Sequence, residues 1–197
     1  MISYILPIYL ALLQFGGGSS EVTTLNFDIL FKDEVVGNLQ ASKFLDDSAQ
    51  HYKSTTSLEI KIVKDFQVDY DYEVYFKDGI LKKSNVDITI NQRPHAQTSV
   101  EWTNTAYAIE INGKKEDVLK DSIGYSTVLL YFREPRGIER CFSEQNGTFN
   151  DLIALGNHRY KKINSKGREN IYQYENGALK EAHIDGGIVS LKMVAKE

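Results

Sequence analysis

Apolar and polar residues alternate with a period of two along most of the chain after Val22. In the clearest run, from Phe66 to Phe76, apolar and aromatic side chains occupy every second position and polar ones the positions between. Residues 25–31, 58–62, 86–90 and 107–111 show the same alternation. Successive side chains of a strand point to opposite faces, so the pattern predicts strands with one dry and one solvated face, as in antiparallel sheets.

Turn-forming pairs separate these runs. Asn-Gly and Asp-Gly pairs readily adopt the positive φ angles of tight hairpins. The pairs are Asp78-Gly79, Asn112-Gly113, Asn146-Gly147 and Asn176-Gly177. Short alternating runs joined by such turns predict a β-meander of about ten strands.

One segment has helical rather than strand spacing. In residues 121–132, Ile123, Thr127 and Leu130 fall on one face of a helix, and Asp121 can cap its N-terminus. Pro135 lies just past the end, so the pattern predicts a helix over 121–132. Residues 148–155 fit either a short helix or a strand.

A sheet with one dry face must roll up or pack against another layer. We therefore expect a mostly β protein with a single curved antiparallel sheet, an open or half barrel of about ten strands. One short helix would pack on its concave face. A sandwich of two sheets is the alternative.

The first twenty residues differ from the rest. Residues 1–15 are apolar except for Ser3 and Gln14, and the small residues 16–20 follow. A helix of this length falls short of a hydrocarbon core of about 30 Å. The pattern predicts a signal peptide over 1–20, a single β domain over 21–197 with no membrane span, and export to the periplasm or cell envelope. An uncleaved anchor is the alternative.

The composition argues against several classes of partner and of bound group. A formal net charge of −4 lacks the positive surface that neutralises phosphates, so we expect no nucleic-acid partner. Cys141 is the single cysteine of the chain, which excludes an intramolecular disulfide. The four histidines lack the spacing of metal ligands, so we expect no metal and no cofactor. They are His51, His95, His158 and His183.

Catalytic motifs are equally weak. Gly124-Tyr125-Ser126 begins like a nucleophile elbow, but Val128 stands where the second glycine belongs. Three carboxylates alternate with three guanidinium groups: Glu134, Glu139 and Glu144 with Arg133, Arg136 and Arg140. Paired carboxylates hydrolyse glycosides, so Glu139 or Glu144 could act on envelope glycan. We favour modest ion pairs and expect no enzyme.

The aromatic faces support a different function. Rolled sheets of this size can enclose a ligand, so their inward side chains can line an apolar cavity. The candidate ligand-binding residues are Phe66, Val68, Tyr70, Tyr72, Phe76, Trp102 and Leu130. We expect a protein that binds a lipid or other apolar small molecule between sheet and helix. The alternative is a non-catalytic structural or interaction protein with a filled core, which docks onto an envelope protein partner.

Three segments resemble a family of uncharacterised exported proteins of Gram-negative envelopes, classified only as a domain of unknown function. They are residues 27–33 with Val36 and Gly37, residues 130–135 followed by 142–144, and residues 172–179. The resemblance spans nearly all of the chain after the predicted signal peptide. It implies an exported, β-rich protein.

A more distant similarity is to another uncharacterised family of periplasmic β proteins. It rests on Leu155-Gly156-Asn157, residues 160–163 and the final hairpin at 179–184. Those proteins are similar in architecture to the lipoprotein-localisation carriers (LolA/LolB-like), in which an incomplete barrel and a helical cover hold acyl chains. This similarity implies a lipid ligand, and it carries over no binding residue.

Overall fold

The computed structural model describes residues 22–46, 49–61, 65–187 and 189–196. The predicted signal peptide therefore lies outside the described residues. Within the described ranges, fourteen strands form one sheet, in the order β8-β7-β6-β5-β4-β3-β2-β1-β14-β13-β12-β11-β10-β9. The strands are β1 Val22–Phe31, β2 Glu34–Asp46, β3 Ala49–Lys61, β4 Asp65–Lys77, β5 Ile80–Ile90, β6 Arg93–Trp102, β7 Tyr107–Ile111, β8 Lys114–Lys115, β9 Arg140–Ser143, β10 Thr148–Gly156, β11 Arg159–Ile163, β12 Glu169–Glu175, β13 Ala178–Asp185 and β14 Ser190–Ala195.

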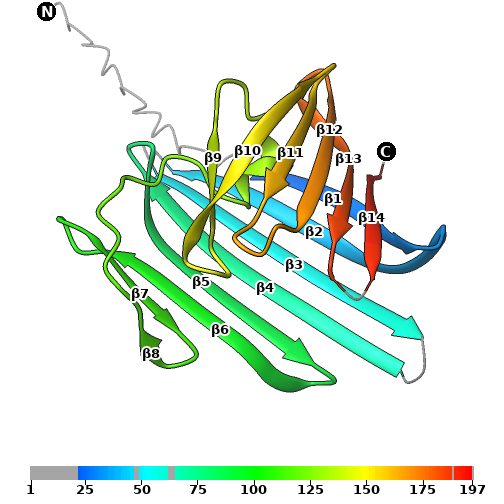
Figure 1. Cartoon of the computed structure of the whole chain (residues 1–197), viewed down its shortest axis with the longest axis horizontal. Helices are drawn as coiled ribbons and strands as arrows, with labels where there is room; N and C mark the ends of the chain where they lie inside the picture. The colour runs from blue at the N-terminus through cyan, green and yellow to red at the C-terminus, as the bar shows by residue number, and fades with distance from the viewer. Residues whose placement is uncertain (1–21, 47–48, 62–64, 188, 197) are drawn as a thin grey trace, which may run out of the picture.

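Each strand pairs antiparallel with its neighbours. The chain meanders outward from β1 to β8, crosses over, and meanders back from β9 to β14. The last strand then pairs with the first, with Phe27 opposite Ala195. The sheet is thus two meanders joined at its middle by the two ends of the described chain (Figure 1).

The sheet curls so that its second half stands over its first half (Figure 1). The turn between β9 and β10 meets the inner face of the first meander, where Thr98 Oγ1 donates to the Gln145 carbonyl at 2.8 Å. Among the described residues, the edge strands β8 and β9 do not pair with one another. The fold is therefore one curled, unclosed antiparallel sheet, as the alternation predicts, and not a two-sheet sandwich.

The strand count exceeds the expected ten because the extra strands are short or weakly alternating. Strand β8 has two residues and β9 has four, too few to show a period. The ambiguous residues 148–155 lie in β10.

In the part of the chain that the structure describes, a single short helix, α1, spans Leu129–Phe132. The helix prediction over 121–132 is therefore right at its end and wrong before Leu129. In the earlier part, backbone groups bond to the sheet instead of to a helical turn: Ile123 O accepts from Leu81 N at 2.9 Å. Ser126 forms a parallel bridge with Phe142. Backbone partners supplied by other strands have overridden the local helical pattern.

The crossover segment that carries α1 lies inside the curl and completes the core. Leu130 is fully buried, and Tyr174 Oη donates to its carbonyl at 2.7 Å. The ring of Tyr131 packs 6.0 Å from Phe27, and that of Phe132 packs 5.3 Å from Tyr52. These contacts place α1 against the concave face, as expected.

Candidate functional site

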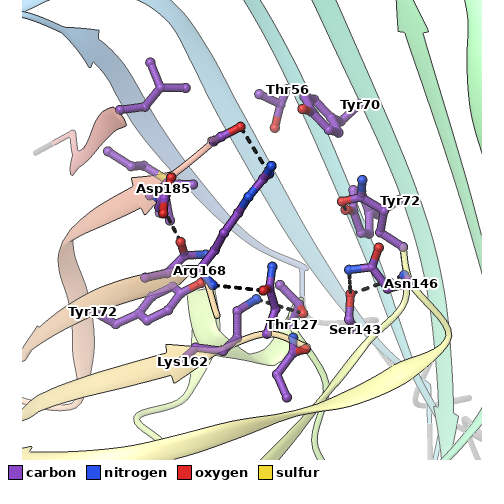
Figure 2. Close-up of a pocket in the computed structure, with 18 of the residues that line it drawn as sticks. Thr56, Tyr70, Tyr72, Thr127, Ser143, Asn146, Lys162, Arg168, Tyr172 and Asp185 are labelled. Carbon is purple, nitrogen blue, oxygen red and sulfur yellow. Dashed lines mark hydrogen bonds between the residues drawn. The ribbon is translucent and has the colours of Figure 1, made fainter. Parts of the chain in front are cut away.

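A cavity of about 560 Å³ lies inside the curl, between the strands of the two meanders. Its side chains come from β1 to β4, from the crossover segment and from β9 to β14 (Figure 2). Small-molecule sites typically enclose about 300–1,000 Å³, so this volume suits a small ligand.

One wall of the cavity is apolar. It is built from inward positions of strands at the middle of the sheet, where β1 and β14 pair. Its side chains are Ile29, Leu39, Leu58, Ile184, Leu191 and Met193. Ile29 and Met193 face each other across the β1–β14 pair, so the joining of the two meanders creates this surface.

A second group of lining side chains, the polar wall, borders this apolar surface. It comes from the β9–β10 hairpin, β11 and β12, and from Thr127 of the crossover segment. Its side chains include Ser143, Asn146, Asn150, Lys162, Asn170 and Tyr172. Tyr70 and Tyr72 of β4 also line the cavity (Figure 2). The cavity therefore has an amphipathic lining.

Lys162 is the most unusual residue of the polar wall. It is 8% exposed, and its Nζ lies 3.4 Å from Thr127 Oγ1 and 5.9 Å from the centre of the Tyr172 ring. Burial acts to lower its pKa, but nearby Tyr172, Cys141 and Glu144 outweigh burial, and the pKa lies above its ordinary value. The side chain is therefore a protonated ammonium at neutral pH.

Asn150 supplies a second buried polar group. It is 3% exposed, on β10, and its Oδ1 has no hydrogen-bond partner within the described part of the chain. A buried polar atom without a partner carries a desolvation cost that a ligand or a water can remove. Asn150 is thus available to a bound molecule.

Arg168 lies near the rim of the cavity. Its backbone N–H donates to Asn164 Oδ1 at 3.0 Å, and its guanidinium donates to the Gly186 carbonyl at 3.2 Å. In Figure 2 the side chain extends toward the strand that carries Thr56. Gly187 lies close to the Arg168 guanidinium: a Cβ on Gly187 would be only 2.5 Å from Arg168 Cζ.

Some of the ligand-binding residues expected from the sequence line the cavity, and others lie elsewhere. Tyr70 and Tyr72 line the cavity. Val68, Phe76 and Leu130 are buried in the core outside its lining, whereas Phe66 is 41% exposed. Trp102 is half-buried, with its ring 4.8 Å from that of Tyr107.

Sequence reasoning missed the polar wall because it searched for apolar faces. A signal was present in β11, where Tyr160 and Lys162 occupy alternate positions and are both buried, while Lys161 between them pairs with Glu169 at 2.9 Å. A lysine in phase with inward side chains marks a buried charge.

The three carboxylates of the arginine-rich segment have separate roles. Glu134 is buried and accepts hydrogen bonds from Arg136, His158 and Tyr160 at 2.8–2.9 Å. Burial acts to raise its pKa, but these bonds outweigh burial and lower the pKa from 4.5 to about 2. The carboxylate therefore clamps the chain after α1 to the β10–β11 hairpin.

Glu144 is fully buried and accepts the backbone N–H groups of Thr127 and Val128, each at 3.1 Å. It satisfies donors at the start of the turn that leads into α1, as a capping carboxylate does. Glu139 is exposed. None of the three lines the cavity.

Within the described ranges, no group of three or more His, Cys, Asp or Glu side chains is placed to hold a metal ion. No helix in those ranges is long and apolar enough to cross a membrane.

Comparison with known proteins identifies a structural relative and a family. No curated protein matches the chain in sequence. The fold is similar to the crystal structure of a β-barrel-like protein of the domain of unknown function DUF1849 from Brucella abortus. The TM-score is 0.51, the sequences are 9% identical, and the match covers 88% of this chain and 95% of the other. At that identity the likeness concerns the fold alone.

The family model that matches covers residues 27–196, from within β1 to the end of the described chain. It thus includes the strands that build both walls of the cavity and the crossover segment between them. On this match the chain belongs to the DUF6134 family, a domain of unknown function.

Proposed function

We propose that this protein binds a lipid or another amphipathic small molecule in the cavity inside the curled sheet. The amphipathic lining carries the proposal: an apolar wall from β1–β3, β13 and β14 borders a polar wall from β9–β12. Ligand sites are typically apolar cavities with a few placed polar groups that fix orientation. In a core that contributed only to stability, the unpartnered Asn150 and the desolvated Lys162 would be destabilising.

We also propose that the protein is exported from the cytoplasm. The apolar run over residues 1–15 and the small residues 16–20 support export through a cleaved signal peptide. Fractionation of cells that express the full chain tests this: the processed protein is expected in the periplasm or cell envelope. Recovery of the unprocessed chain in the cytoplasm would contradict it.

Ligand binding is tested with protein purified without detergent from its own envelope. Native mass spectrometry of residues 21–197 is expected to show an added mass of lipid size that is released on unfolding. After delipidation, fatty acid or phospholipid should raise the melting temperature in a saturable manner, because a ligand that binds only the native state stabilises it.

A clean apo mass together with an unchanged melting temperature would contradict the binding proposal. It would favour a non-catalytic interaction protein of the envelope, in which the cavity holds only water.

A further inference from the structure

Positive charge is concentrated in the cavity of a protein that is acidic as a whole. The formal net charge of the chain is −4. The cavity lining nevertheless contains three cationic side chains, Lys162, Lys166 and Arg168, and one acidic side chain, Asp185. The site thus favours negative charge although the surface as a whole does not.

The lysine within the cavity has no counter-ion at contact distance. Among the described residues, no carboxylate oxygen lies within 4.0 Å of Lys162 Nζ. Its polar neighbours are neutral hydroxyls, that of Thr127 at 3.4 Å and that of Tyr172. Both oxygens of the neighbouring Glu144 are engaged by backbone N–H groups. A buried ammonium group costs free energy unless an opposite charge pairs with it. Lys162 has no such charge at contact distance within the described part of the protein.

Hydroxyl donors line the same part of the cavity. Ser143 Oγ accepts hydrogen bonds from Asn146 at 3.2 and 3.3 Å, so its own proton is free to donate to a ligand, and the Tyr172 hydroxyl lines the same wall. An ammonium together with neutral O–H donors is a suitable environment for an oxyanion, since charge-assisted hydrogen bonds are the strong ones. The unpartnered Oδ1 of Asn150 is an acceptor, so it suits an O–H or N–H group of the ligand or a water.

We infer that the bound molecule carries an anionic oxygen group, a carboxylate or a phosphate, and that Lys162 binds this group. The apolar part of the molecule then lies against the apolar wall. This inference rests on the proposed function and narrows its ligand to anionic amphiphiles. Lys166 and Arg168, which are more exposed, add positive charge along the lining.

The test compares two probes that differ only in the head group. Dodecanoate and dodecanol are titrated into the delipidated protein by calorimetry. A charge-assisted hydrogen bond in a buried site contributes about 1.5–3 kcal/mol, so dodecanoate is expected to bind at least about tenfold more tightly. This comparison uses the unaltered protein and does not depend on how a variant folds.

The matched variants are Lys162→Met and Lys161→Met, which remove neighbouring charges from opposite faces of β11. The preference for dodecanoate should disappear in Lys162→Met and persist in Lys161→Met, because Lys161 pairs with Glu169 away from the cavity. Equal affinities for the two probes, or a preference that survives in Lys162→Met, would overturn the inference.

Two further results separate this inference from the proposed function. If neither probe binds, the proposed function fails and the inference fails with it. If inorganic phosphate alone binds as strongly as dodecanoate, the anion site is supported and the proposal of an amphipathic ligand is contradicted.

Discussion

Two buried glutamates hold the crossover segment in place, and neither is in the cavity. Glu144 binds the backbone just before α1, and Glu134 binds three side chains just after it. Hydrogen bonds to a charged group contribute about 1.5–3 kcal/mol each, and Glu144, which accepts two of them, is fully buried. Arg136 and His158 are more than half exposed, so solvent weakens their bonds to Glu134. These contacts fix Thr127 beside Lys162, and so they position part of the cavity wall.

The lowered pKa of Glu134 predicts an acid-sensitive clamp. Its pKa is about 2 in the folded protein and 4.5 ordinarily, so its contribution is fully present above about pH 4.5 and is lost as pH falls toward 2. Urea unfolding at about pH 5 and about pH 3 should show a smaller loss of stability on acidification for Glu134→Gln than for the natural chain.

The exposed Glu139 supplies the control. The Glu139→Gln variant should lose stability on acidification as the natural chain does. An equal loss in all three proteins would show that Glu134 does not contribute.

At the scale of the elements, close approach of β2 and β3 depends on one residue without a side chain. Gly37 lies opposite Ile29 on β1 and Leu58 on β3. A Cβ on Gly37 would lie 2.6 Å from Leu58 Cα and would overlap the Ser57 carbonyl. Both are backbone atoms and cannot move aside without displacing β3, and β3 carries Leu58 of the apolar wall.

Gly37→Ala should therefore lower the free energy of unfolding by about 1–3 kcal/mol, the usual cost of overpacking. Chemical denaturation measures it. Gly124→Ala is the matched control, because an added Cβ there would lie 3.7 Å from the Gly79 carbonyl oxygen, at ordinary contact distance. An equal small effect of both substitutions would contradict the predicted close approach.

At the scale of the whole molecule, the last strand holds the two meanders together. Strand β14 pairs with β1 on one side and β13 on the other, and it supplies Leu191 and Met193 to the apolar wall. A strand at the middle of a sheet satisfies the backbone groups of both neighbours, so its loss exposes two new edges.

Truncation after Asp185 removes β14 and should abolish cooperative unfolding and ligand binding together. A shorter truncation after Ala195 removes Lys196, with its ion pair to Asp28 and its backbone bond to Asn26, and should cost only a small shift in the denaturation midpoint. A cooperative transition of unchanged midpoint in the chain truncated after Asp185 would show that the two meanders do not depend on β14 to hold together.

The class of the fold follows from local patterns in the sequence. Period-two alternation from Phe66 to Phe76 requires a sheet with one dry face, and the Asp-Gly and Asn-Gly turns make it antiparallel. In the structure, Asp78, Asn112 and Asn176 have the positive φ angles that these turns need. These are local consequences of side-chain order and backbone sterics, so one sequence was enough to predict them.

Which inward side chains meet across the cavity depends on tertiary contacts that the sequence pattern does not show. The helical spacing of residues 121–132 gave way to pairing with strands distant in sequence, which leaves α1 with four residues. Likewise, Lys162, Asn150 and Met193 share one cavity only because β14 pairs with β1 and the second meander folds over the first. Alternation assigns a face to each residue, but the curl of the sheet brings faces together, and curl depends on contacts between distant parts of the chain.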